Sequence, residues 1–225
     1  MNILTNGCSF TYGEELDSPT TQAWPYVLES MMREADPQSD FNAHTVTNLA
    51  TRGASNTKIL RDTIEYINKD PLEVDMVVIG WSDCTRAEFY THRPIRHNLY
   101  TNYKGPIQIN VNWSNPEYFG PDTFFEDYYK YWQDYSLDYA NWLTQVQLLE
   151  SYLEDLNIDH KFFIAFGNTI DYEIANKYLF RKEHFLGWPD ERMVDWVDGL
   201  PKCPDGHPGS EAHRLVAKKI LTEIT

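Results

Sequence analysis

Short apolar runs alternate with mixed polar and apolar stretches along much of the chain. Two of the runs, VDMVVIGW and HKFFIAFG, are apolar almost throughout. A run of this length is typical of a strand that is buried on both faces of a parallel sheet. We predict strands over residues 1–6, 44–50, 74–81 and 160–167.

Between these strands the apolar residues recur every three or four positions, which is the spacing of an amphipathic helix. The pattern predicts helices over residues 20–35, 55–68, 137–156 and 209–224. Pro25 is tolerated only in the first turn of its helix, and Ser55 or Asn56 is the expected N-cap of the next. The stripes expected to face the core are Ile59, Leu60, Ile64 and Ile67, then Leu143, Val146, Leu149, Leu153 and Leu156, then Leu215, Val216, Ile220 and Leu221.

This alternation predicts a single α/β domain over residues 1–225. Right-handed crossovers then produce a parallel sheet of about five strands, covered by helices on both faces in a three-layer α/β/α arrangement. Ligands bind such sheets at the carboxyl ends of the strands, so the segments after the strands are where chemistry is expected. These segments begin at Gly7, Thr51, Gly80, Gly167 and Leu200.

The amino-acid composition and net charge limit which kinds of molecule the chain is expected to bind. The chain has 225 residues, of which 42% are hydrophobic, and this is sufficient for a packed core. Its formal net charge of −15 repels nucleic acid and anionic membranes, so neither is an expected partner. No stretch approaches the roughly 20 apolar residues of a membrane span, and no signal peptide is recognisable. We therefore expect a cytoplasmic protein.

The three cysteines, Cys8, Cys84 and Cys203, have neither the spacing of a disulfide framework nor a C-x-x-C motif. Closed zinc sites use four ligands, which these residues do not supply. His92 and His97 are a further pair of metal-type side chains, but nothing in their spacing favours a site. We expect no metal and no cofactor.

The motif GCSFTYG places Ser9 directly after the first predicted strand. A serine there lies close to the N-terminus of the next helix, where unpaired backbone N–H groups stabilise a developing oxyanion. Serine beside glycine at a strand end is more often a turn or cap residue. Taken alone, the motif does not distinguish a nucleophile from a structural serine.

Polar or glycine-containing stretches also follow the next two strands. NLATRGASN contains Gly53, at which the backbone can approach a ligand closely. IGWSD ends with Ser82 and Asp83, which can donate to or orient a substrate. Each also has a structural interpretation, as a turn glycine and as helix caps.

Before the last helix, the stretch CPDGHPGSEAH contains His207 on a loop fixed by proline and glycine, with Asp205 two residues upstream. A histidine there can act as a general base, and a neighbouring carboxylate can fix its tautomer. The alternative is an exposed loop histidine without a catalytic role.

Together, the stretches resemble the sequence blocks of the SGNH (GDSL-type) hydrolase family. GCSFTYG matches the first block with Ser9 at the nucleophile position, and NLATRGAS matches the second with Gly53 at the oxyanion-hole glycine. DGHPGSEAHRLVA matches the last block, with Asp205 and His207 at the Asp and His positions. Members are esterases, lipases, thioesterases and carbohydrate deacetylases. The resemblance implies a flavodoxin-like sheet and ester hydrolysis without a cofactor.

The third block departs from the family pattern. It normally reads Gly-x-Asn-Asp, and here Gly80 is followed by Trp81, Ser82 and Asp83. The family's asparagine amide is an oxyanion donor, and loss of one such donor costs on the order of 100 to 1,000-fold in rate. Ser82 is shorter and must rotate its hydroxyl to donate. Asn56 is the reserve amide.

The last block departs in spacing. The family has two residues between the aspartate and the histidine, and here only Gly206 separates Asp205 from His207. We keep Asp205 as the expected orienting acid and Asp198 as the reserve. If neither pairs with His207, a Ser–His dyad remains, which acts more slowly.

Residues 84–135 interrupt the alternation and are rich in aromatics, many of them interleaved with acids. Aromatic faces are common in sugar and acyl-chain pockets, so we predict that this insertion is a lid or substrate wall. Packing onto the sheet and an oligomer interface are the alternatives. A basic cluster in the same region is available for an anionic substrate group or for the acidic surface: Arg86, His92, Arg93, Arg96 and His97.

The sequence therefore predicts a serine hydrolase that cleaves a carboxylic ester or an O-acetyl group on a small molecule or carbohydrate, through an acyl-enzyme on Ser9. The expected oxyanion donors are the N–H groups of Ser9 and Gly53 and a side chain at or near Ser82. One alternative is a weakly active or inactive binding or scaffold module, which the serine at position 82 favours. Another is an enzyme that uses Cys8, but neighbouring residues at a strand end face opposite ways. The oligomeric state is not predicted.

Overall fold

Strand β1 (Asn2–Gly7) lies in the interior of a four-stranded parallel sheet with the order β2-β1-β3-β6. The structure is a computed structural model that describes residues 1–225 apart from 38–42, 96–102, 110–126, 168–170 and 179. β1 pairs with β3 from Ile3 opposite Met76 to Gly7 opposite Gly80, so the two strands end level with each other. The other strands are β2 (Thr45–Asn48), β3 (Met76–Trp81) and β6 (Asp159–Ile164).

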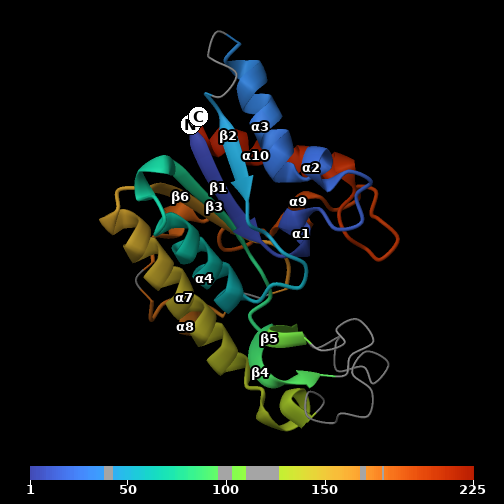
Figure 1. Ribbon diagram of the computed structural model, residues 1–225, viewed down its shortest axis with the longest axis vertical. Helices are drawn as coiled ribbons and strands as arrows, with labels where there is room; N and C mark the ends of the chain where they lie inside the picture. The colour runs from blue at the N-terminus through green and yellow to red at the C-terminus, as the bar shows by residue number, and fades with distance from the viewer. Residues whose placement is uncertain (38–42, 96–102, 110–126, 168–170, 179) are drawn as a thin grey trace.

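Two pairs of long helices cover the sheet (Figure 1). α3 (Trp24–Ala35) packs with α10 (Ser210–Ile224) on one face, and α4 (Asn56–Ile67) packs with α7 (Tyr135–Asp155) on the other. Strand β3 is buried along its whole length, as a strand covered on both faces must be. Within the described ranges, no helix is both long and apolar enough to span a membrane.

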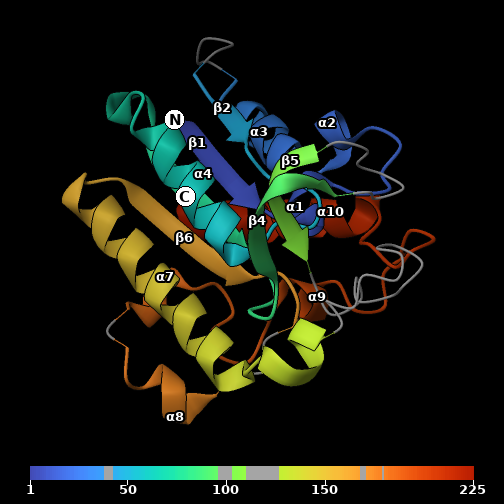
Figure 2. The same ribbon diagram turned by 60° about the horizontal axis from the view of Figure 1, so that its bottom comes forward.

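Short elements connect these layers. The region predicted as an insertion contains two antiparallel strands, β4 (Ala87–Ile95) and β5 (Tyr103–Ile109), which lie beyond the carboxyl ends of the sheet strands (Figure 1) and on the side of α1 (Figure 2). The remaining elements are α1 (Ser9–Tyr12), α2 (Pro19–Gln22), η1 (Pro71–Glu73), η3 (Tyr128–Trp132), α8 (Tyr172–Ala175), η4 (Lys182–His184) and α9 (Met193–Trp196).

The predicted α/β class and parallel sheet are confirmed, with four strands in place of about five. At the sheet edge beyond β6, the chain near Phe185 forms a single parallel bridge with Phe162, and Leu186 N–H donates to Phe162 O at 2.8 Å. Where a fifth strand was predicted, the chain therefore forms only this single bridge.

The predicted helices are present, with local corrections. The helix expected over residues 20–35 is divided at Ala23, because Pro25 has no N–H to continue the first helix. Leu156 and Leu215 were expected in core stripes but are 37% and 40% exposed. Leu156 follows the last helical residue of α7, and the buried face of α10 runs through Ala212, Val216 and Ile220 instead.

Asn6, near the end of β1, is a buried polar residue whose hydrogen bonds fasten the strand to α4. Its amide donates to Ile59 O and to Thr63 Oγ1, both at 3.0 Å, and its side-chain oxygen accepts from Gly7 N–H at 2.7 Å. A buried amide without these partners would be costly, so the pairing fixes where the strand ends relative to the helix.

Gly7 and Gly80 leave room for the turn that follows β1. A methyl group at Gly7 would lie 2.3 Å from Thr11 Oγ1 and 2.9 Å from Gly80 O, and one at Gly80 would lie 2.8 Å from Thr11 Oγ1. The side chain of Thr11, on α1, therefore sits directly over the two strand ends. Only glycine at these positions permits this approach.

We predict that Gly7→Ala lowers the free energy of unfolding by about 1–3 kcal/mol, because the methyl group overpacks this contact. Urea unfolding followed by circular dichroism measures the change. Two of the three close contacts at Gly7 are to Thr11, so adding Thr11→Ala should restore part of the loss. Equal stability of Gly7→Ala and the wild type would show that α1 is not held by this contact.

Candidate active site

Ser9 is the first residue of α1, and only Cys8 separates it from the last residue of β1. The side chain is nearly buried, with the residue 6% exposed, and Cys8 before it is fully buried in the core. The turn closes through hydrogen bonds from Thr11 and Tyr12 N–H to Cys8 O. Because a helix begins at Ser9, the Ser9 N–H has no acceptor within that helix.

His207 is bound by Glu15, a residue that the sequence analysis did not select. Glu15 Oε2 lies 2.8 Å from His207 Nδ1 and 3.4 Å from the His207 backbone nitrogen. Its other oxygen accepts from Asp205 N–H at 2.8 Å. Glu15 follows α1 by three residues and has a positive φ of 65°, which aims its side chain back at this loop.

The side chains predicted to orient His207 lie elsewhere. The exposed Asp205 contributes its backbone N–H to Glu15, and no hydrogen bond or ion pair joins its carboxylate to His207 among the described residues. The same holds for Asp198, whose backbone N–H bonds to Asp195 O at 3.4 Å. No local signal marks Glu15, because it is 192 residues from His207 in the sequence.

The contacts around Glu15 favour its ionised form. Burial acts to raise the pKa of the carboxyl, but the hydrogen bonds from Asp205 N–H, the His207 ring and His207 N–H outweigh it and lower the pKa below its usual value. An ionised Glu15 accepts from Nδ1–H, which leaves Nε2 of a neutral His207 as the basic nitrogen. That is the tautomer a general base requires.

A row of rings leads from His207 to the insertion. The rings of His207 and Phe10 are 5.5 Å apart, and Phe10 stacks on Phe166 at 4.7 Å. The Arg86 guanidinium lies over Phe166 at 4.8 Å and donates to Ala54 O at 3.3 Å. Arg86 is the member of the predicted basic cluster whose side chain the structure describes. The other four side chains lie outside the described residues.

The loop that carries Gly53 is fastened to α1. Arg52 forms an ion pair with Glu14 and lies over the ring of Tyr12 at 5.1 Å, and Asn48 Nδ2 donates to Thr11 O at 3.3 Å. Gly53 has a φ of 69°, in the left-handed region that glycine adopts readily. These contacts bring the second sequence block beside the first.

Two hydrogen bonds join Ser82 and Asn56. Both are buried, and Asn56 accepts from Ser82 N–H at 2.8 Å while its amide donates to Ser82 O at 3.1 Å. One amide hydrogen of Asn56, the reserve oxyanion donor, is therefore committed to the end of β3. Among the described residues, no hydrogen bond joins Ser9 Oγ to His207, so the structure brings the two onto neighbouring segments without direct contact.

His213, six residues after His207, is not a competing base. It is fully buried in α10, and its Nδ1 accepts from Trp24 N–H at 3.1 Å. Burial lowers the pKa of His213 to about 4, with a smaller contribution from the charge of His207. At neutral pH this ring is uncharged and structural.

Within the described part of the chain, one group of side chains has donor atoms placed for a metal ion, namely Glu150, His160 and His184. His160 is the second residue of β6, at the amino end of the sheet. This cluster is therefore at the opposite end of the strands from Ser9.

A family of unknown function (DUF6071) matches residues 22–180, a range that contains Gly53 and Ser82 but neither Ser9 nor His207. No curated protein matches the chain.

Solved structures share the fold at low sequence identity. TesA superposes with a TM-score of 0.54 at 13% identity, covering 100% of this chain and 98% of TesA. The psychrotrophic esterase EstA from Pseudoalteromonas sp. gives 0.53 at 13% identity, with coverage of 99% and 96%. A catalytic mutant of Axe2, an acetylxylan esterase from Geobacillus stearothermophilus, gives 0.53 at 14% identity, with coverage of 99% and 93%. The fold is therefore that of SGNH-type esterases.

We predict that Glu15 makes the free energy of unfolding depend on pH in the acidic range. Because the pKa is lower in the folded state, the unfolded chain binds more protons between the two pKa values, and stability rises with pH there. The contribution of Glu15 is complete above the ordinary carboxyl pKa and is lost as pH falls through the lowered value. The stability difference between wild type and Glu15→Gln should shrink on going from about pH 7 to about pH 3.

Urea unfolding at several pH values measures this difference. Asp205→Asn is the matched control, since it removes a carboxylate from the same loop and leaves the Glu15–His207 contact. A difference that stays constant with pH in Glu15→Gln would contradict the pairing, as would a larger effect in Asp205→Asn.

Proposed function

We propose that this chain, which belongs to the DUF6071 family of unknown function, is a serine hydrolase of the SGNH type that cleaves a carboxylic ester or an O-acetyl ester. The observation that carries the proposal is the Glu15–His207 pair, 2.8 Å apart, on segments that adjoin the turn bearing Ser9. The fold shared with esterases and the position of Ser9 at the carboxyl end of β1 support it.

In the proposed mechanism, Ser9 Oγ attacks the ester carbonyl carbon and His207 Nε2 takes its proton. Glu15 holds Nδ1–H and stabilises the imidazolium that forms. His207 then protonates the leaving alcohol, and an acyl-enzyme remains on Ser9. Water, deprotonated by His207, hydrolyses the acyl-enzyme and releases the acid. A hydrogen bond between Ser9 and His207 is expected to form with substrate bound, as catalytic contacts often tighten in the complex.

The proposed acid is thus Glu15 rather than Asp205. Glu15 supplies a carboxylate oxygen to the ring nitrogen, and it also accepts two backbone N–H groups of the His207 loop. Those bonds hold the carboxylate in one orientation, which is what a positioning acid needs. Asp205 takes part through its backbone, as one of the two donors.

For the oxyanion, the proposal uses the N–H groups of Ser9 and Gly53. Ser9 begins a helix and has no acceptor within it, and Gly53 lies on the loop that Arg52 ties to α1. A third donor comes from Ser82, which follows β3, or from Asn56, the first residue of α4. Asn56 donates one amide hydrogen to Ser82 O, which leaves its second hydrogen for a ligand.

The proposed substrate class is an acylated carbohydrate or a similar small ester. Phe10 and Phe166 offer stacked rings beside His207, and Arg86 adds a cation at their edge. Aromatic faces bind the apolar faces of sugar rings and acyl chains. One of the proteins with this fold is an acetylxylan esterase.

The second candidate is a binding module with little or no catalysis on the same fold. Two observations favour it: no hydrogen bond joins Ser9 to His207 among the described residues, and Asn56 is engaged with the backbone of Ser82. The Glu15–His207 pair argues against it, because a binding module has no need of an oriented basic imidazole.

We predict that a fluorophosphonate probe labels Ser9 and that Ser9→Ala is not labelled, as read by intact mass and peptide mapping. The probe reacts with an activated serine and does not depend on the identity of the ester. Glu15→Gln should lower the labelling rate by about 10²- to 10⁴-fold, because the imidazole loses its positioning acid. Asp205→Asn should keep the wild-type rate. No adduct on folded wild-type protein would favour the binding module, and a greater loss in Asp205→Asn would restore that residue as the acid.

We also propose that residues 1–225 form one domain in which the insertion 84–135 is a lid or wall that selects substrates. Its first strand is attached to the core by an ion pair between Glu88 and Arg61 at 2.5 Å, and Arg86 reaches the aromatic row. The described part of the insertion lies beyond the carboxyl ends of the sheet strands (Figure 1), where Ser9 is found.

Deletion of residues 89–107 tests whether the hairpin selects substrates. Glu88 and Gln108 are paired across the hairpin, so an Asn-Gly turn can join them and keep the ion pair to Arg61. We predict that this variant keeps probe labelling of Ser9 while its preference for acetylated xylo-oligosaccharide over p-nitrophenyl acetate changes at least tenfold. An unchanged substrate preference would show that the hairpin only packs against the core and does not select substrates.

A further inference from the structure

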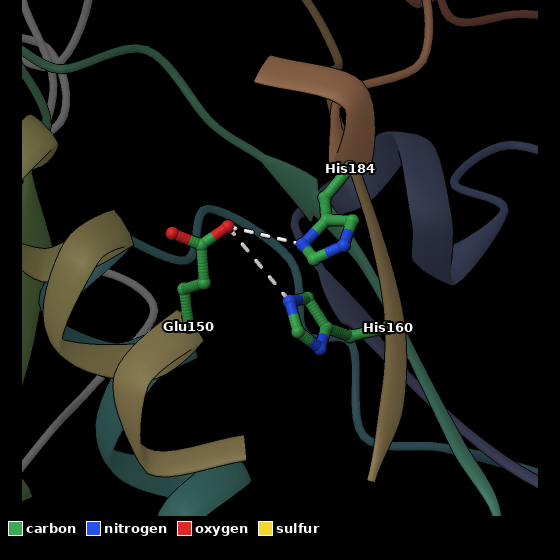
Figure 3. A group of neighbouring side chains, drawn as sticks. All are labelled: Glu150, His160 and His184. Atoms are coloured by element: carbon green, nitrogen blue, oxygen red, sulfur yellow. Dashed lines mark hydrogen bonds and ion pairs between the residues drawn. The ribbon is translucent and has the colours of Figure 1, made fainter. Parts of the chain in front are cut away.

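Three side chains from separate elements converge at the amino end of β6 (Figure 3). Glu150 comes from α7, His160 from β6 and His184 from the end of η4. Glu150 Oε1 lies 3.1 Å from His184 Nδ1 and 3.9 Å from His160 Nε2, and the three donor atoms all lie within 4.8 Å of one another. Each can supply one ligand to a metal ion.

The orientation of His160 leaves one nitrogen without a hydrogen-bond partner. Its Nδ1 lies 3.1 Å from Ile158 O, and since a carbonyl only accepts, Nδ1 carries the proton. In the neutral ring, Nε2 then presents a lone pair toward Glu150. This atom is buried, on a side chain 3% exposed, and has no hydrogen bond. Two acceptors that face each other in a buried place are satisfied by a cation between them.

The surroundings of the three side chains match those of metal ligands. A ligating histidine usually donates its second ring N–H to a carbonyl or carboxylate, as His160 does to Ile158 O. Ligating carboxylates are themselves hydrogen-bonded, and both oxygens of Glu150 accept from Arg181 N–H, at 3.0 and 2.9 Å. These bonds hold the two buried ligands in place.

From this geometry we propose that Glu150, His160 and His184 bind a divalent transition metal ion of the zinc type. Two imidazole nitrogens and one carboxylate oxygen are a ligand set that zinc accepts, with water in the fourth position. Ligand atoms of a tetrahedral zinc lie about 3.4 Å apart, so side-chain shifts of about an ångström complete the site. A cavity of about 480 Å³ lined by His160 and His184 gives access to water.

The charges around the cavity are compatible with a cation. Arg181 is paired with Glu154 at 2.9 Å, which offsets the guanidinium charge near the site. The cavity is also lined by Asp159, Lys161 and Glu223. Carboxylates therefore outnumber the cationic side chains on its wall, in a protein whose formal charge is −15.

The site is independent of the proposed hydrolase centre. His160 is in register with Val77 of β3, and Val77 is in register with Leu4 of β1, near the start of each strand. Ser9 follows the opposite end of β1. A metal here joins α7, β6 and η4, so it stabilises the edge of the sheet rather than taking part in ester cleavage.

Calorimetric titration of tag-free, chelator-treated protein with zinc chloride tests the proposal, with bound metal measured after dialysis. The wild type should bind one zinc per chain and unfold at a higher temperature when loaded, because a ligand that binds only the folded state stabilises it. His184→Gln and His160→Gln should each weaken binding at least about tenfold. Cobalt loading should give the visible spectrum of a four-coordinate ion.

His44→Gln is the matched control, since His44 is also paired with a carboxylate, Asp36 at 3.4 Å, but has no third ligand among the described residues. His207→Gln excludes binding at the hydrolase centre. Both should keep wild-type affinity. The absence of stoichiometric zinc on the wild type overturns the proposal, and so does binding that survives His184→Gln. If His160→Gln does not fold, the partly exposed His184 decides the result alone.

Discussion

The close approach of β1 and β3 at Gly7 and Gly80 is the constraint on which the candidate site depends. With no side chains there, Thr11 can lie over both strand ends, and only Cys8 separates β1 from the start of α1. Asn6 adds three buried hydrogen bonds that fasten the same point to α4 and to Gly7 N–H. The location of Ser9 follows from this backbone packing.

Around this point the molecule assembles a site from distant parts of the chain. Glu15 holds the His207 loop through three hydrogen bonds, and Arg52 ties the Gly53 loop to α1 by an ion pair and a ring contact. Phe10 and Phe166 continue the site toward the insertion. The short segment from Ser9 to Glu15 therefore contacts the loops that carry His207, Gly53 and Phe166.

Different kinds of side-chain contact hold the two ends of the sheet. At the carboxyl end, polar contacts hold the loops of the proposed hydrolase centre, whereas at the amino end a buried carboxylate and two imidazoles come together from α7, β6 and η4. β6 contributes a residue to each end of the sheet. His160 lies near its amino end, and Phe166 follows its carboxyl end. The proposed hydrolase centre and the proposed metal site thus lie at opposite ends of the same sheet.

The α/β class, the approximate bounds of the main helices and strands, and the turn that carries Ser9 could all be predicted from the sequence. Apolar periodicity and glycines at turns are local signals, which a single stretch of sequence contains. The sequence did not determine which acid faces His207: Asp205 is near in sequence, but the positive φ of Glu15 turns another carboxylate into that place from 192 residues away. The cluster of Glu150, His160 and His184 was missed for the same reason. Pairing between side chains on separate elements is decided by tertiary packing, which one-dimensional spacing does not encode.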